Sequence, residues 1–326
     1  MQYGNAINYG SQADVKASDI AFSIHSDVDS AFYDVEYPDH EWYGIVTTDQ
    51  VMRGVNPGAT TYSYMKRDRH GAAAFVGNGP SNNIPMVGQS VGANEVPLAC
   101  AAVGALITNE DARQYSFGFN ADLARDLGET MREACDNLVE STVIFGNADI
   151  GFLPWINYPG ITVINAAVGS GGATEWKDKA GEEMVADVNS ALNYIWEVTR
   201  KVIKPLDVFL PMKQYTLLSQ TAVALGGVNL AMTALEFLKK YNIMTDQTGQ
   251  ELRITSSRYL AGAGAGGTDR MVIMDRNRRN QCLPMPMDYN LGQPVTVPLA
   301  VEMYAEMKFG SYHVREKYSM LYVDGI

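Results

Sequence analysis

The 326-residue sequence has few charged residues, few cysteines and few histidines. Charged side chains make up 19% of the chain, and 25 Lys and Arg against 37 Asp and Glu give a net charge of −12. Because phosphate contacts need a basic protein face, this balance argues against a general affinity for nucleic acid. The three cysteines, Cys100, Cys135 and Cys282, are odd in number and far apart. They imply no disulfide framework and fit a reducing compartment.

Several other signals are absent. No apolar run reaches the roughly 18 residues of a membrane span, and the polar start is not typical of a signal peptide. The four histidines, His25, His40, His70 and His313, are isolated from one another and from the cysteines, so no zinc spacing is present. No pair of carboxylates has a context that marks an acid–base couple. We therefore expect no metal, no cofactor and no catalytic residue.

Two short motifs nevertheless match patterns of enzyme sites. Gly262–Gly267 fits the dinucleotide fingerprint G-x-G-x-x-G, but a strand-like run follows it where the fingerprint needs a helix. Gly88–Gly92 fits the nucleophile elbow G-x-S-x-G, again without the helix that must follow the serine. A soluble α/β nucleotide-binding enzyme that uses the glycine-rich loop is therefore a remote alternative.

The most regular stretch runs from Asn120 to Gly146 and predicts one long amphipathic helix, about 39 Å long at 1.5 Å per residue. Asn120 suits the N-cap, and Gly146 can adopt the left-handed conformation that ends a helix. The expected apolar stripe consists of Leu123, Leu127, Met131, Ala134, Leu138, Thr142 and Phe145. Such a helix needs a sheet or other helices along its whole length.

The segments before this helix alternate between polar and strand-like. Residues 1–44 hold too little apolar sequence to fold alone, so they are disordered or lie along another subunit, and their aromatic residues favour the second reading. Ala59–Lys66 and Gly71–Val76 predict a long hairpin with Arg67–His70 at its tip. Gly88–Leu106 reads as a strand in which Pro97 marks an edge or a break, and a short helix begins at Thr108.

An α/β region follows, over residues 149–292. Its expected strands are Ile161–Val168, Leu206–Leu210, Glu251–Thr255 and Met271–Asp275, and its expected helices are Glu182–Lys201, Tyr215–Leu225 and Asn229–Tyr241. The helix Glu182–Lys201 places Met184, Val188, Leu192, Ile195 and Val198 on one stripe. Two further strand segments complete the chain from about residue 293 onward.

Four features together resemble the major capsid proteins of tailed bacteriophages. These are the long helix with its abrupt stop before Asn157-Tyr158-Pro159-Gly160, the Leu210–Tyr215 segment, the Gly262–Arg270 loop and the C-terminal Tyr322–Ile326. That family has the Hong Kong ninety-seven type capsid fold, which encapsulin shell proteins share. The resemblance implies an α+β fold with an N-terminal arm (1–44), an extended loop (45–87), a peripheral domain (88–148) with a spine helix (120–146), an axial domain (149–292) and C-terminal strands of the peripheral domain (293–326).

The resemblance also implies a function. The chain would assemble with itself into pentamers and hexamers of an icosahedral phage head, which encloses double-stranded DNA without sequence-specific binding. Portal, scaffold and decoration proteins would be its further partners, assembly would take place in the host cytoplasm, and no membrane would be involved. An encapsulin-type nanocompartment shell is the alternative within the same fold.

Two groups of residues are candidates for contacts between subunits. Lys66, Arg67, Arg69 and His70 at the predicted hairpin tip form either a solvated turn or a contact with the acidic face of a neighbour's long helix. The acidic candidates on that helix are Asp122, Asp126, Glu129 and Glu133, and the aromatic anchors of the N-terminal arm are Phe32, Tyr37 and Trp42.

Overall fold

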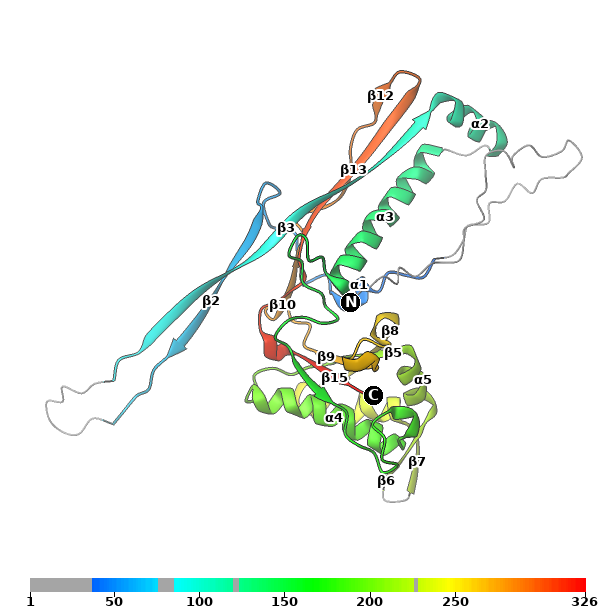
Figure 1. Ribbon diagram of the computed structural model, residues 1–326. Helices are drawn as coiled ribbons and strands as arrows, with labels where there is room; N and C mark the ends of the chain where they lie inside the picture. Colours follow the sequence, from blue (N-terminus) through cyan, green and yellow to red (C-terminus); the bar gives the residue numbers. More distant parts are fainter. Residues whose placement is uncertain (1–36, 76–84, 120–122, 226–227) are drawn as a thin grey trace, which may run out of the picture.

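The computed structural model describes residues 37–75, 85–119, 123–225 and 228–326. Figure 1 shows a long two-stranded ribbon that projects from the molecule as an arm, a sheet with a long helix lying along it, and a separate α/β body below. This ribbon, called the arm below, consists of β2 (Thr61–His70) and the first half of β3 (Gly88–Thr108). It is distinct from the N-terminal arm of residues 1–44, which always keeps its full name.

The strand β3 is 21 residues long and changes partner at its middle. Residues 88–97 pair with β2, whereas residues 98–108 pair with β13 (Ala300–Gly310), both in antiparallel register. Pro97 lies at the change of partner, where its missing N–H removes no ladder bond that the sheet needs. The predicted strand is confirmed, and the predicted break at Pro97 is an exchange of partners.

The predicted hairpin is right in outline and wrong in register. Residues 71–75 are not a strand, and the partner of β2 is Gly88–Pro97 instead of Gly71–Val76. Arg67 and Arg69 lie inside β2, opposite Val91 and Gln89, so they are not at the tip. The physical reason is that a strand already anchored in the body extends its ladder outward, whereas a glycine followed by three alanines offers little for cross-strand packing.

The sheet beside the long helix has the order β11–β13–β3–β2, with β11 at Met287–Leu291 and β12 (Val295–Val297) paired to β13. The short helix predicted after Thr108 is α2 (Asn109–Phe119), and the Thr108 hydroxyl accepts a hydrogen bond from the Asp111 N–H at 3.1 Å. The long helix α3 (Leu123–Phe145) contacts one face of this sheet through Met131, Ile107 and Met303.

The predicted long helix is confirmed, and part of its predicted stripe is buried or half-buried, at Leu123, Leu127, Met131 and Thr142. The rest of the stripe is rotated. The buried apolar positions are Met131, Cys135, Val139, Val143 and Ile144. Ala134, Leu138 and Phe145, which the prediction placed on the stripe, are exposed. The helix buries the path of i+4 steps from Met131 through Cys135, Val139 and Val143, one residue further along the chain than the predicted Ala134 and Leu138. Gly146 has φ +71° and ends the helix as expected, whereas Asn120 and Asp122 lie outside the described residues.

The α/β body is built on a sheet in the order β4–β15–β9–β5–β8. Its strands are β4 (Thr162–Asn165), β15 (Met320–Asp324), β9 (Arg270–Met274), β5 (Asp207–Pro211) and β8 (Arg253–Ser257). Its helices are α4 (Gly181–Val198), α5 (Met212–Gln220), α6 (Ala234–Lys240) and α7 (Ile243–Thr248). On α4 the predicted stripe is confirmed from Met184 to Ile195, and Val198 is exposed.

Two sequence predictions for this body are wrong. Residues 222–225 and 229–233, which the sequence predicts as parts of helices, belong to the paired strands β6 (Ala222–Leu225) and β7 (Val228–Thr233). The C-terminal strand β15, which was grouped with β13, lies between β4 and β9 in the sheet of the body. The chain therefore ends inside a different sheet from the one that β13 completes.

Short elements join the two parts. A three-stranded sheet combines β1 (Val51–Met52), β10 (Gln281–Pro284) and β14 (His313–Val314). Near the lower end of α3 lie α1 (Trp42–Ile45) and the short helix η3 (Arg258–Leu260), and η5 (Lys317–Ser319) precedes β15. One of the two large hydrophobic clusters unites residues of α1, α3, β9, β10 and β13, so the two parts share a core.

Candidate assembly surfaces

The arm has two faces with different side chains. In an antiparallel pair, residues directly opposite each other point to the same side, and neighbours along a strand point to opposite sides. Arg67 and Arg69 therefore share one face, whereas Lys66 and His70 share the other. The four residues predicted as one cluster are divided between the two faces of a ribbon.

Large apolar side chains of the arm, and of the residues that follow β2 and precede β3, are exposed to solvent. Met65 and Met86 are 80% and 87% exposed, Phe75 is fully exposed, and Val91 lies open beside Arg67. Exposed apolar side chains that gather in one region of a soluble protein are typical of a protein–protein contact. The arm has the character of an interface without a partner in the single chain.

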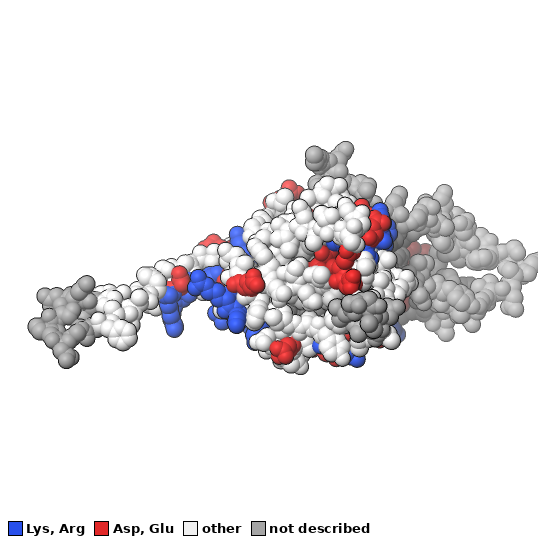
Figure 2. All heavy atoms as spheres, turned by 90° about the horizontal axis from the view of Figure 1, so that it is seen from below, with Lys and Arg blue, Asp and Glu red and all other residues white. Residues whose placement is uncertain are grey.

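The basic residues of the arm differ in what they contact. Lys66 forms an ion pair with Glu316 of the same chain, with Nζ and Oε2 2.7 Å apart. Arg67 and Arg69 are exposed and form no ion pair within the described part of the chain. Seen from below, Lys and Arg side chains gather along the arm close to the body (Figure 2). The free basic charge of the arm is thus carried by the two arginines.

The acidic candidates on α3 lie away from the arm of their own chain, on a solvent-facing side of the helix. Asp126 accepts a hydrogen bond from the Tyr115 hydroxyl at 2.6 Å, and Glu129 forms an exposed i,i+4 ion pair with Arg125. Glu133 is half-buried. A contact between these three carboxylates and a neighbouring subunit stays a prediction.

The aromatic candidates differ among themselves. Phe32 lies outside the described residues, and Tyr37 is half-exposed. Trp42 was predicted as a contact to another subunit, but it is only 5% exposed and belongs to the core of its own chain, where its ring stacks on Tyr43. The reason is that α1 is fixed against the end of α3, so this part of the N-terminal segment is anchored within the subunit.

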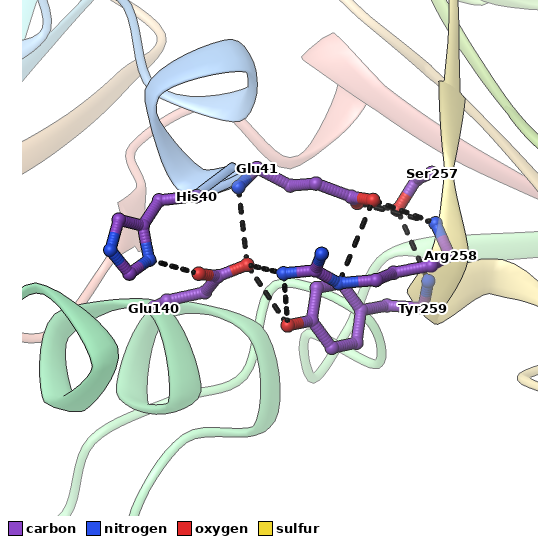
Figure 3. A network of polar contacts seen from close by, with 6 residues as sticks. All are labelled: His40, Glu41, Glu140, Ser257, Arg258 and Tyr259. Carbon is purple, nitrogen blue, oxygen red and sulfur yellow. Dashed lines mark hydrogen bonds and ion pairs between the residues drawn. The ribbon is translucent and has the colours of Figure 1, made fainter. Parts of the chain in front are cut away.

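That anchor is a polar network that the sequence prediction missed (Figure 3). The Glu140 carboxylate, on α3, accepts hydrogen bonds from His40 Nδ1 at 2.7 Å, from the Glu41 N–H at 3.1 Å, and from Arg258 and Tyr259 at 2.9 Å each. Glu41 in turn accepts from the Ser257 hydroxyl at 2.6 Å. Three segments that are far apart in the sequence meet at this one carboxylate.

The environment of Glu140 shifts its protonation. Burial acts to raise the pKa of the carboxyl, but the hydrogen bonds from His40, Tyr259 and the Glu41 N–H, with the charge of Arg258, hold the pKa below its usual value. The sequence contained one signal of this network, a Glu at a position that continues the buried face of an amphipathic helix.

The two enzyme-like motifs lack the context that their chemistry needs. In the glycine-rich loop, the Gly262 N–H donates to Asp269 at 2.8 Å and the Ala265 N–H donates to Asp324 at 2.9 Å, so carboxylates of the chain take the donors that a phosphate would need. The strand β9 follows directly. Gly88–Gly92 lies within β3, with no helix after the serine.

Within residues 37–75, 85–119, 123–225 and 228–326, no group of three or more His, Cys, Asp or Glu is placed to hold a metal ion. Among the helices in those ranges, none has the length and apolar character to cross a membrane.

Comparisons with known proteins agree with this architecture. The sequence model of the family described as "Major capsid protein" matches residues 71–326. The capsid of Myoviridae phage XM1 is similar in structure with a TM-score of 0.73 at 15% identity, covering 96% of this chain and 99% of that chain. A chain of Gordonia phage Cozz gives 0.58 at 14%, covering 97% and 96%, and the capsid of the native GTA particle gives 0.57 at 12%, covering 96% and 98%. No curated protein matches the sequence. The expected capsid fold is confirmed.

Proposed function

Because the chain belongs to the major capsid protein family and is a structural capsid protein, we propose that its copies form the pentamers and hexamers of an icosahedral phage head. The observation that carries the proposal is the arm, which projects from the body with its apolar side chains exposed. Contacts in which a projection of one copy meets a different surface of the next are head-to-tail, and they close into rings when the rotation allows.

The proposal gives each part of the chain a role. Residues 1–44 are the N-terminal arm, 45–87 the extended loop, 88–148 the peripheral domain with its spine helix, 149–292 the axial domain, and 293–326 the C-terminal strands. The strand β15 completes the axial sheet although it follows the peripheral strand β13. Assembly takes place in the host cytoplasm with portal, scaffold and decoration proteins, and it needs no catalytic residue.

The head would enclose double-stranded DNA without binding it tightly or sequence-specifically. With a net charge of −12, the chain has no excess of cations to release counterions from phosphates. Retention of the genome then depends on the number and area of contacts between copies, and obligate interfaces of this kind bury on the order of 2,000 Å² or more.

The arginines of the arm offer a specific contact. Arg67 and Arg69 would lie against the acidic side chains Asp126, Glu129 and Glu133 of a neighbour's α3. Asp122, which comes just before this helix in the sequence, is a further candidate for the same contact. On the opposite face Lys66 pairs with Glu316 of its own chain, so of these two residues His70 is the one that would contact a neighbour. Each exposed ion pair contributes only about 0–1 kcal/mol, so these contacts set the register of neighbours more than they stabilise the shell.

The experiment is assembly of the purified full chain, followed by sedimentation and negative-stain microscopy. We expect megadalton shells from the unchanged chain, and we expect Arg67→Glu/Arg69→Glu to assemble poorly while its subunit melts at an unchanged temperature. Arg113→Glu/Lys177→Glu is the matched control, since both side chains are exposed away from the arm.

Two outcomes would count against the proposal in different ways. An unchanged chain that stays at 35.7 kDa at every concentration would contradict assembly itself. Normal shells from Arg67→Glu/Arg69→Glu would contradict only the contact between the arm and the helix.

A further inference from the structure

A pocket of about 540 Å³ lies in the α/β body, between α4, α6 and α7. Small-molecule sites in proteins have volumes of roughly 300–1,000 Å³, so the pocket is large enough for such a ligand. Its residues belong to the helices of the body and are distinct from the candidate contact residues of the arm and of α3. The lining side chains that decide its chemistry are Asn189, Asn193, Lys240, Tyr241, Ile243 and Asp246.

The wall formed by α6 and α7 is fixed by Asn242, which lies between the two helices. Its Oδ1 atom accepts hydrogen bonds from the N–H groups of Met244 and Thr245, at 2.9 Å each. Its Nδ2 group donates to the Leu238 carbonyl at 2.6 Å and to the Thr245 hydroxyl at 2.8 Å. These contacts use both donors and both acceptor positions of the carboxamide. Asn242 is therefore a structural part of the wall, and the pocket is preformed.

The opposite wall, on α4, carries two carboxamides of a different kind. Asn189 and Asn193 lie one turn apart on the same face of the helix, about 6 Å along its axis. The Oδ1 atom of each is buried and accepts no hydrogen bond from a residue that the structure describes. Buried acceptors without a donor are costly and rare in folded proteins. Two of them on one wall of one pocket indicate a ligand that donates hydrogen bonds.

The other side chains narrow the class of that ligand. Lys240 and Asp246 are exposed and supply one charge of each sign, so the lining favours neither an anion nor a cation. Ile243 is the one aliphatic side chain among the described residues of the lining, which argues against a lipid. The Tyr241 ring is 57% exposed, and the Phe237 ring, with its centre 5.4 Å away, fixes its position. This ring offers an apolar face beside polar groups.

We infer that the pocket binds a neutral carbohydrate. The hydroxyls of a sugar ring donate to the Oδ1 atoms of Asn189 and Asn193, and the C–H face of the same ring packs on Tyr241. An extended peptide also supplies donors through its N–H groups. The carbohydrate is favoured because one small uncharged ring reaches both carboxamides and the tyrosine face within a pocket of this size. The inference concerns a site within one chain and does not depend on the proposed assembly.

The test is ligand-observed NMR on the purified full chain, in which saturation passes from the protein to glucose, galactose, mannose or N-acetylglucosamine. We expect transfer to at least one of these sugars, strongest at the C–H protons of one ring face. Because the signals come from the free sugar, the measurement works for a single subunit and for an assembled shell. A tetramer of the same sugar that binds more tightly than the monomer assigns the pocket to a polysaccharide, and equal affinity assigns it to a free sugar.

Two variants separate a binding site from a structural one. Asn189→Leu/Asn193→Leu removes both unpartnered acceptors, so sugar affinity should fall about tenfold or more while the melting temperature stays the same or rises. Tyr241→Ala should weaken binding about threefold to tenfold through loss of the ring contact. Tyr304→Ala on β13 is the matched control, because that tyrosine is 51% exposed and lies outside the pocket, and it should leave binding unchanged.

Three results would overturn the inference. The first is the absence of saturation transfer to every sugar and tetramer tested, including the case in which tetraglycine binds instead and assigns the pocket to a peptide. The second is sugar binding that Asn189→Leu/Asn193→Leu leaves unchanged, which places the sugar elsewhere. The third is a lower melting temperature of that variant, because the two carboxamides would then stabilise the fold. None of these results bears on the assembly of shells, so the proposed function is tested separately.

Discussion

Glu140 allows a direct test of how the N-terminal segment is fixed to the spine helix. Its side chain is 4% exposed and accepts hydrogen bonds from four donors. In Glu140→Leu, Arg258 loses its buried carboxylate, and breaking a buried pair from one side costs about 3–5 kcal/mol of unfolding free energy. In Glu140→Gln, one amide oxygen can keep the three donors that now share Oε1, so the expected cost is only about 1–2 kcal/mol.

The assay combines denaturant unfolding with hydrogen exchange. Both variants should speed exchange at amides of residues 41–46 and 258–260, with the larger effect in Glu140→Leu, while α4 stays unchanged. Glu129→Gln on the same helix is the control, because that side chain is exposed and should change stability by less than about 0.5 kcal/mol. Equal effects of Glu140→Leu and Glu129→Gln, or unchanged exchange near α1, would refute the idea that this carboxylate holds the three segments together.

Three further predictions concern single sites. Gly146→Ala should cost about 2–4 kcal/mol in denaturant unfolding, because a Cβ at φ +71° would lie 2.6 Å from the Phe152 carbonyl oxygen. Gly128→Ala, in the same helix with open space around it, should instead stabilise by up to about 1 kcal/mol, and a loss there would contradict the comparison. Because the pKa of His313 is lowered from 6.5 to about 4, the unfolded chain binds the proton more tightly, so stability should fall as the pH drops from 6.5 to 4. On the order of 2 kcal/mol of that fall, after allowance for partial exposure, should be missing in His313→Gln, and parallel pH curves of the two proteins would reject it. Lys179→Met should cost about 3–5 kcal/mol because it leaves the buried Asp187 without its ammonium partner at 2.5 Å, and Lys179→Met/Asp187→Leu should recover part of this loss; equal midpoints for the two variants would argue against the pairing.

The parts of the fold that local rules determine could be predicted from the sequence. The buried stripe of α4 follows its 3.6-residue period, the start of α2 follows from the Thr108 cap, and the end of α3 follows from Gly146. In each of these places the residues that decide the structure lie within one or two turns of one another. Local propensity and tertiary packing agree in these places, so the sequence pattern alone determines the element.

The parts that failed depend on contacts across long sequence distances. The register of the arm depends on β3 being anchored by β13, about 200 residues later, which no pattern near β2 reveals. β15 pairs with β4 across about 160 residues, and Glu140 meets Arg258 across 118. Trp42 is buried for the same reason, because the hydrogen bonds to Glu140 hold α1 against α3. Such pairings depend on packing throughout the core, and the residues next to each strand in the sequence do not determine them.

The strand β3 connects the stability of the subunit to the contacts between subunits. Its inner half, residues 98–108, lies in a sheet covered by α3, whereas residues 88–95 are exposed and pair with β2 alone. An isolated two-stranded ribbon is marginally stable in water, so β2 and the outer half of β3 gain most of their stability from what covers them. Among the residues that the structure describes, His313, Arg315 and Glu316 contact β2 at the base of the ribbon. In the proposed assembly another copy covers the ribbon beyond Lys66, and because the outer half is continuous with a strand of the core, we expect such a contact to stabilise the sheet that α3 covers.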